Sequence, residues 1–180
     1  MTTTENLSAE RGDLLEALQK HRELFRFTVQ GLDDEQAGAR STVSELTLGG
    51  LIKHVTQVEK TWAAFIVEGP APRPDIDWAN VDWSNPPPEV AAYADGFRML
   101  EGETLAALLE EHAAVAAATD ALVASVDLDQ RQPLPEAPWF KPGATWSARR
   151  VFVHIVAETA QHAGHADIIR EAIDGQKSMG

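Results

Sequence analysis

The chain of 180 residues contains no cysteine, and its 28 acidic and 15 basic residues give a formal net charge of −13. Disulfides, thiolate metal sites and cysteine nucleophiles are therefore excluded, and so acidic a chain disfavours binding to nucleic acid or to anionic membranes. The N-terminal stretch MTTTENLSAERG is polar, and no run of about 18 apolar residues follows it. Neither a signal peptide nor a transmembrane helix is expected, and a cytoplasmic location is the default expectation.

Hydrophobic periodicity predicts four long helices. They cover residues 8–30, 48–67, 103–125 and 146–173, with a short turn near residues 90–94. Thr47 and Thr145 are expected to cap the second and fourth helices at their N-termini, and Gly31, Gly69 and Gly175 to end the first, second and fourth.

Two long connections, residues 70–89 and 127–145, are rich in proline and tryptophan. Loops of this length often form the wall or lid of a functional site. No strand of comparable length and no internal repeat is expected. Four amphipathic helices with two long connections predict an all-α protein, a four-helix bundle of the antiparallel type, as a single domain over residues 1–180.

Polar side chains recur at helical spacing on the predicted fourth helix: His154, Glu158, His162 and His165. One ion cannot bind all four, because His154 and His162 are two turns apart, roughly 12 Å along the helix axis. Each adjacent pair can share an ion, since side chains three or four residues apart lie on the same face. A third ligand must then come from another helix, and His54 on the predicted second helix is the candidate. Two imidazoles and a carboxylate suit zinc, and also nickel, iron or manganese, and three protein ligands leave a coordination position open for catalysis.

These residues also have an ordinary interpretation without a metal. Histidine and glutamate four residues apart form ion pairs on many helix surfaces. His21 and His112 lie among charged neighbours, so we expect both to be solvated. The spacing alone therefore leaves the metal site a hypothesis, with the choice of pair open.

Two stretches, LIKHVTQVE at residues 51–59 and VHIVAETAQHAGHADIIR at residues 153–170, resemble the DinB-like superfamily of four-helix metal-binding proteins. Within it the chain is most similar to the branch of mycothiol-dependent maleylpyruvate isomerase and mycothiol S-transferases. The resemblance covers nearly the whole chain and is most specific in these two stretches.

The resemblance implies that one divalent metal ion, most simply zinc, is held by His54, Glu158 and His162. It also implies that His154 and His165 are not primary ligands. In better-characterised members the metal activates a low-molecular-weight thiol, so the resemblance further implies mycothiol or a similar thiol as co-substrate.

The sugar–inositol head of mycothiol would need hydrogen-bonding groups and flat aromatic surfaces. Residues in or next to the two long connections could supply them: Trp83, Trp139, Lys141, Arg149 and Arg150.

Three functions are compatible with these residues. The first is a metal-dependent thiol S-transferase or thiol-dependent isomerase that acts on small electrophiles in detoxification. The second is a non-catalytic metal- or ligand-binding bundle. The third is a metal-dependent hydrolase in which Glu59 or His165 acts as the base. The expected partners are a small-molecule thiol and an electrophile, with no nucleic acid and no membrane, and homodimerisation is left open.

Overall fold

The computed structural model describes residues 7–72, 81–82, 84–137 and 139–178. Within these ranges the chain forms six helices and one two-stranded sheet. In chain order they are α1 (Ala9–Phe27), α2 (Asp34–Gly38), α3 (Leu48–Glu68), α4 (Pro88–Asp95), α5 (Leu105–Ser125), β1 (Arg131–Pro133), β2 (Thr145–Ser147) and α6 (Ala148–Asp174).

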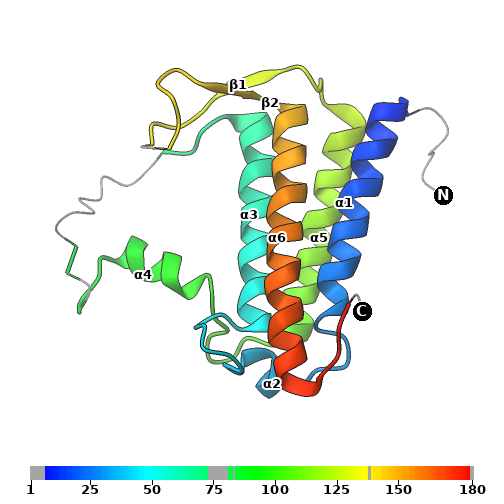
Figure 1. The fold of residues 1–180 in the computed structure, drawn as a ribbon. Helices are drawn as coiled ribbons and strands as arrows, with labels where there is room; N and C mark the ends of the chain where they lie inside the picture. The colour runs from blue at the N-terminus through cyan, green and yellow to red at the C-terminus, as the bar shows by residue number, and fades with distance from the viewer. Residues whose placement is uncertain (1–6, 73–80, 83, 138, 179–180) are drawn as a thin grey trace.

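The four long helices α1, α3, α5 and α6 stand side by side and confirm the predicted all-α bundle (Figure 1). α1 and α6 run in one direction, and α3 and α5 run in the other. α3 packs against both α5 and α6, and α1 packs against α6 and α5. α3 and α6 are therefore antiparallel neighbours, which places their inner faces opposite each other. No helix among the described residues is long and apolar enough to cross a membrane.

The start of the fourth long helix differs from the prediction. Thr145 and Trp146 belong to β2, which pairs antiparallel with β1 so that Arg131 lies opposite Ser147. Ser147 is the N-cap of α6, and its hydroxyl accepts a hydrogen bond of 3.2 Å from the backbone N–H of Arg150. β-branched and aromatic residues favour extended backbone, and serine caps a helix as well as threonine does. The prediction of Thr145 as the cap was therefore wrong by two residues.

The interior of the bundle holds two apolar clusters separated by polar side chains. One cluster gathers around Phe25, Leu51 and Leu108, and the other around Leu18 and Phe152. Between them lies a set that we call the polar layer, contributed by three helices: Arg22 of α1, Glu59 of α3, and His112 and Asp120 of α5.

His112 is not solvated as the sequence analysis expected. Its side chain is only 1% exposed, and neither ring nitrogen has a hydrogen-bond partner among the described residues. Burial lowers its pKa to about 4, so the ring is neutral at physiological pH. The charged neighbours in sequence misled the prediction, because the buried positions 105, 108, 112, 119 and 123 of α5 follow helical spacing.

Two glycines at the start of α3 allow another segment to lie directly against the helix backbone. A Cβ on Gly50 would lie 2.0 Å from the carbonyl oxygen of Phe97, and one on Gly49 would lie 2.1 Å from Sδ of Met99. This close approach brings the ring of Phe97 onto His54, with 4.0 Å between the ring centroids.

We predict that Gly50→Ala destabilises the protein by about 1–3 kcal/mol, because a backbone carbonyl cannot move away as cheaply as a side chain. The matched control is Gly12→Ala in α1, where an added Cβ would meet nothing within 4 Å. The control should leave stability unchanged or raise it slightly, since alanine is the better helix former. Denaturant unfolding of the three proteins measures the effect. Equal stability of both variants would contradict the close approach.

Candidate metal centre

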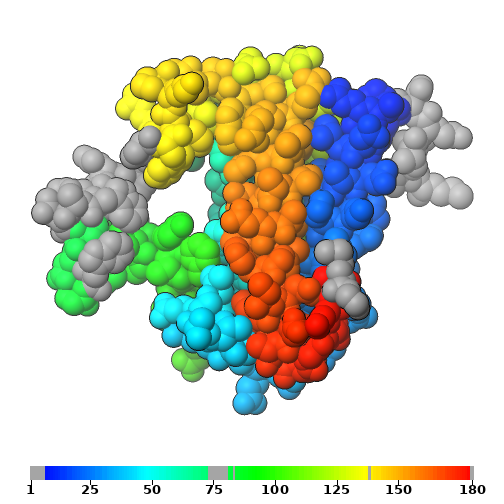
Figure 2. All heavy atoms as spheres, viewed as in Figure 1, coloured from blue at the N-terminus to red at the C-terminus, as the bar shows by residue number. Residues whose placement is uncertain are grey.

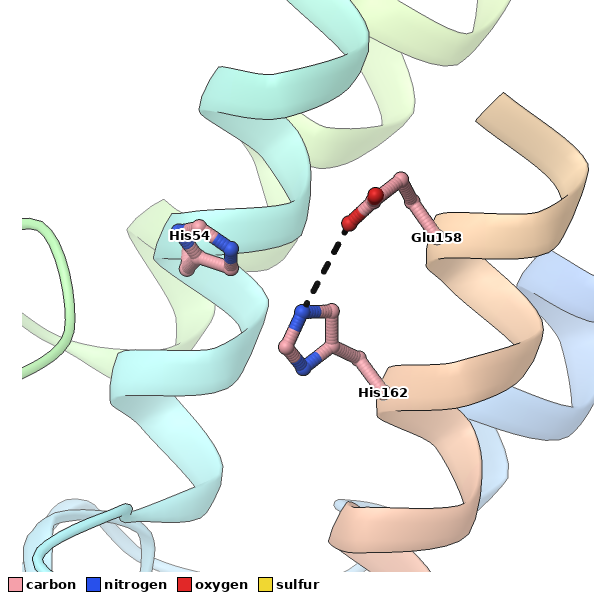
Figure 3. A group of neighbouring side chains, drawn as sticks. All are labelled: His54, Glu158 and His162. Carbon is pink, nitrogen blue, oxygen red and sulfur yellow. Dashed lines mark ion pairs between the residues drawn. The ribbon is translucent and has the colours of Figure 1, made fainter. Parts of the chain in front are cut away.

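Three side chains from α3 and α6 converge between the two helices (Figure 3). His54, Glu158 and His162 each offer one ligand atom, and these atoms all lie within 4.8 Å of one another. Nε2 of His162 is 3.8 Å from Oε2 of Glu158. We call these residues the triad.

The triad residues lie on the faces of α3 and α6 that are turned toward each other. Glu158 and His162 are four residues apart on α6 and flank its buried stripe, which includes Ile155 and Thr159. They are therefore partly exposed, at 29% and 13% of their side chains. His54 points toward them from the facing side of α3.

Both histidines of the triad are kept neutral by their surroundings. Burial, helped by the nearby His162, lowers the pKa of His54 to about 4. Burial, helped by His165, also lowers the pKa of His162. A neutral imidazole has a free lone pair, which is the form that binds a metal ion.

The donor set and its spacing fit a divalent metal ion. Ligand atoms about 2.1 Å from one ion lie at most about 4.2 Å apart, so small side-chain rotations would close the triad around an ion from its present span of 4.8 Å. Two nitrogens and one carboxylate oxygen are also a recognised zinc ligand set.

Each triad residue on α6 has a second histidine beside it. Nδ1 of His165 lies 3.5 Å from Nδ1 of His162, on the side of the ring away from the nitrogen nearest Glu158. Nε2 of His154 lies 3.6 Å from Oε1 of Glu158. Such contacts orient metal ligands and fix histidine tautomers. His154 and His165 thus flank the triad, and their exclusion from the ligand set remains a prediction.

Aromatic side chains border the triad on two sides. On one side Trp62 stacks on Trp146 with 4.9 Å between centroids, and His154 contacts both rings edge-on at 4.8 and 5.0 Å. The guanidinium of Arg150 lies 4.2 Å over Trp146. On the other side lies Phe97, against His54.

In Figure 2 the surface recedes beside α3 and α6, between the loop that follows β1 and the helix α4.

Sequence reasoning did not assign Trp62, Trp146 or Phe97 to the site. For Trp62 a signal existed, because eight residues separate it from His54 on α3 and such residues share a helix face. Phe97 carried no comparable signal, since its position depends on the backbone contact at Gly50.

The candidate thiol-binding residues are placed differently from one another. Arg150 belongs to the aromatic border. The guanidinium of Arg149 pairs with Glu10 and Asp129 instead, so it is directed into an ion-pair cluster and not to the triad.

The remaining candidates lie in the long connections. Trp139 is 71% exposed and contacts Phe140, which in turn contacts Trp146. Lys141 is exposed on the loop between β1 and β2. Trp83 falls outside the described residues.

Glu59, a candidate base, belongs to the polar layer. It is 1% exposed, and its two carboxylate oxygens accept hydrogen bonds of 3.2 and 2.6 Å from Arg22. A carboxylate held in this way inside the bundle has no access to a substrate at the triad, so the structure gives no support to Glu59 as a base.

A hollow of about 580 Å³ lies away from the triad, between the end of α1 and the start of α5. Its lining includes Arg26, Phe27, Leu105 and Leu109, and it contains no triad residue. Because it lacks a convergent set of ligand or nucleophilic groups, the chemistry of the site is assigned to the triad instead.

The chain is similar to known proteins in both fold and sequence family. The fold is shared with a solved structure described as the conserved protein of locus from Enterococcus faecalis, at a TM-score of 0.65 and 15% sequence identity, covering 95% of this chain and 100% of that chain. No curated protein matches the chain at a significant level. The family model for mycothiol S-transferases matches residues 13–175, a span that contains the whole triad. The chain therefore belongs to the mycothiol S-transferase family.

Proposed function

We propose that this protein is a metal-dependent S-transferase that joins a low-molecular-weight thiol of the mycothiol type to small electrophiles, or uses that thiol to isomerise them. The observation that carries the proposal is the convergence of two neutral imidazoles and one carboxylate within 4.8 Å in a chain of this family. A cytoplasmic role in detoxification is part of the same proposal.

The ligands in this proposal are His54, Glu158 and His162, with zinc as the first choice of ion and nickel, iron or manganese as alternatives. A bound divalent ion with an open position favours the thiolate over the thiol at neutral pH, which produces a nucleophile. The chain contains no cysteine, so the reacting sulfur has to be supplied by the co-substrate.

The other residues of the site have roles that follow from their contacts. His165 would hold the His162 ring with its far nitrogen toward the ion, and His154 would limit the rotation of Glu158. Trp62 and Trp146 offer flat apolar surface against which a sugar or inositol ring can pack, and Arg150 adds N–H donors for its hydroxyl groups. The aromatic border also keeps water away from the reacting sulfur.

The hydrolase alternative is less well supported than thiol transfer. It needs a base that reaches a water at the open position. Glu59 is held by Arg22 inside the bundle, and the nitrogen of His165 that contacts the triad is turned to His162. A non-catalytic binding protein would bind metal without turnover, and the experiments below distinguish that outcome.

We predict that His162→Ala lowers metal content far more than His154→Ala does. His162 offers a ligand nitrogen, whereas His154 lies outside the triad, near Oε1 of Glu158, and the other oxygen of Glu158 pairs with His162. Plasma mass spectrometry of the purified variants measures metal per chain. Equal metal loss in the two variants would contradict the assignment of His162, and not His154, as a metal ligand.

We further predict how the rate of thiol conjugation depends on pH and on a chelator. The pKa of His54 is lowered to about 4 and that of His162 is lowered from its usual value, so both rings are neutral and able to bind metal at neutral pH. The rate with metal should therefore rise at acidic pH, as the rings lose their protons, and should be level by neutral pH. With chelator, the residual rate should keep rising toward the pKa of a free thiol, about 8.5.

Initial rates with mycothiol, a simpler thiol and no thiol, each with a generic electrophile, measure this dependence. Turnover that needs both thiol and metal is the expected result. A pH profile unchanged by chelator would contradict metal activation of sulfur. Thiol-independent cleavage of an ester or amide would select the hydrolase instead.

A further inference from the structure

An ion-pair network crosses the bundle at the polar layer, with Arg22 and Glu59 buried and the Asp120 side chain 44% exposed. Nε and Nη2 of Arg22 donate to the two oxygens of Glu59 at 3.2 and 2.6 Å, and Nη1 donates to Asp120 at 2.8 Å. The Arg22 and Glu59 side chains are 6% and 1% exposed. One guanidinium on α1 therefore contacts both α3 and α5.

Overall stability does not explain such a network. Burying an arginine and a glutamate removes both from water, and their mutual attraction often does no more than offset that loss. Replacing a buried ion pair by apolar side chains of similar volume is frequently neutral or stabilising. The better-attested use of buried polar groups is to select one register between helices.

Near the triad, the apolar side chains of α3 and α5 give less directional contacts than an ion pair does. The buried side chains of α3 near the triad are aliphatic, among them Leu51, Ile52 and Val55, and aliphatic side chains of similar size can exchange positions at modest cost. α5, which packs on α3, is rich in alanine. The alanine side chain is small, so it interdigitates little with side chains of the neighbouring helix.

The triad requires an accurate register. A slip of α3 by one helical turn would displace His54 by about 5.4 Å, which is more than the 4.8 Å that spans the whole ligand set. Glu59 is five residues from His54 on the same helix, so fixing the position of Glu59 along the axis also fixes that of His54.

A second buried arginine completes the connection to α6. Nη1 of Arg170 donates to the backbone carbonyls of Thr28 and Gln30, both at 2.9 Å. These carbonyls follow the end of α1, so Arg170 fixes α6 relative to α1. Arg22 then fixes α1 relative to α3. The position of His54 on α3 relative to Glu158 and His162 on α6 is thus fixed through the contacts of both helices with α1.

We propose that Arg22 and Glu59 are positioning residues that set the register of α3 and thereby hold His54 opposite Glu158 and His162. The inference rests on the proposed metal site and adds to it a pair of residues with no contact to the ion. The planar fork of arginine suits this role, because its N–H donors point in fixed directions and reach Glu59 and Asp120 together.

The test is the double variant Arg22→Met/Glu59→Leu, which removes both charges and keeps apolar volume. The control is Lys60→Met/Glu111→Leu, which removes an exposed ion pair, 3.2 Å long, between α3 and α5. For both variants and the wild type, three properties are measured: helicity and thermal unfolding of the metal-free protein, the Zn²⁺ dissociation constant, and the visible spectrum with Co²⁺.

We expect the double variant to keep its helicity and its unfolding temperature while binding Zn²⁺ at least about tenfold more weakly, as for other residues that support metal ligands. Its Co²⁺ spectrum should change because the ligand geometry is no longer fixed. The control should match the wild type in all three properties.

Each other outcome for the double variant overturns the inference. Unchanged Zn²⁺ affinity in a folded double variant would mean that apolar packing alone sets the register. Loss of helicity would mean that the pair is needed for folding itself and not for register. If the wild type binds no Zn²⁺, the proposed metal site itself is wrong, and the inference that rests on it is wrong too. That outcome is seen in the wild type alone, so it is distinguishable from a failure of the register role, which is seen in the double variant.

Discussion

The structure depends on one constraint, which is that α3 and α6 present polar side chains to each other at the same level along the bundle axis. Neither helix can form the triad alone, because His54 comes from α3 and the other two residues come from α6. The antiparallel contact of the two helices supplies the convergence. The apolar clusters above and below the polar layer supply the stability that keeps the helices together. The site therefore requires stable packing and also a correct register, and different residues provide them.

Much of this arrangement could be predicted from the sequence. Helical periodicity located the four long helices, and histidine and glutamate spacing on α6 located a polar cluster opposite His54. Spacing could not choose among the adjacent pairs, since that choice depends on where α3 lies against α6. The family resemblance selected the pair that the structure brings together with His54.

The features that escaped prediction depend on contacts distant in sequence. Phe97 reaches His54 because Gly50 lacks a side chain, and nothing in the local sequence announces that contact. Glu59 looked available as a base, yet Arg22, 37 residues away, holds it inside the bundle. Local charge also misled the prediction for His112, where helix phase and not the neighbouring residues decides burial.

The electrostatics of the site differ from those of the whole molecule. The chain carries a net charge of −13, which favours cations over anions near its surface. Within the site, burial lowers the pKa values of His54, His154 and His162 and so favours their neutral forms. A cation entering the triad would therefore meet one carboxylate and neutral nitrogens, and no competing positive charge on those rings.

X-ray absorption spectroscopy of the zinc-loaded protein, with and without thiol, tests the central claim most directly, because it reports the atoms bound to the ion. The account predicts a nitrogen and oxygen shell at about 2.0–2.1 Å with two imidazoles, and a sulfur neighbour at about 2.3 Å that appears only when thiol is added. Because the chain has no cysteine, a thiolate sulfur bound to zinc must come from the added thiol. A zinc site whose spectrum does not change with thiol would contradict the account.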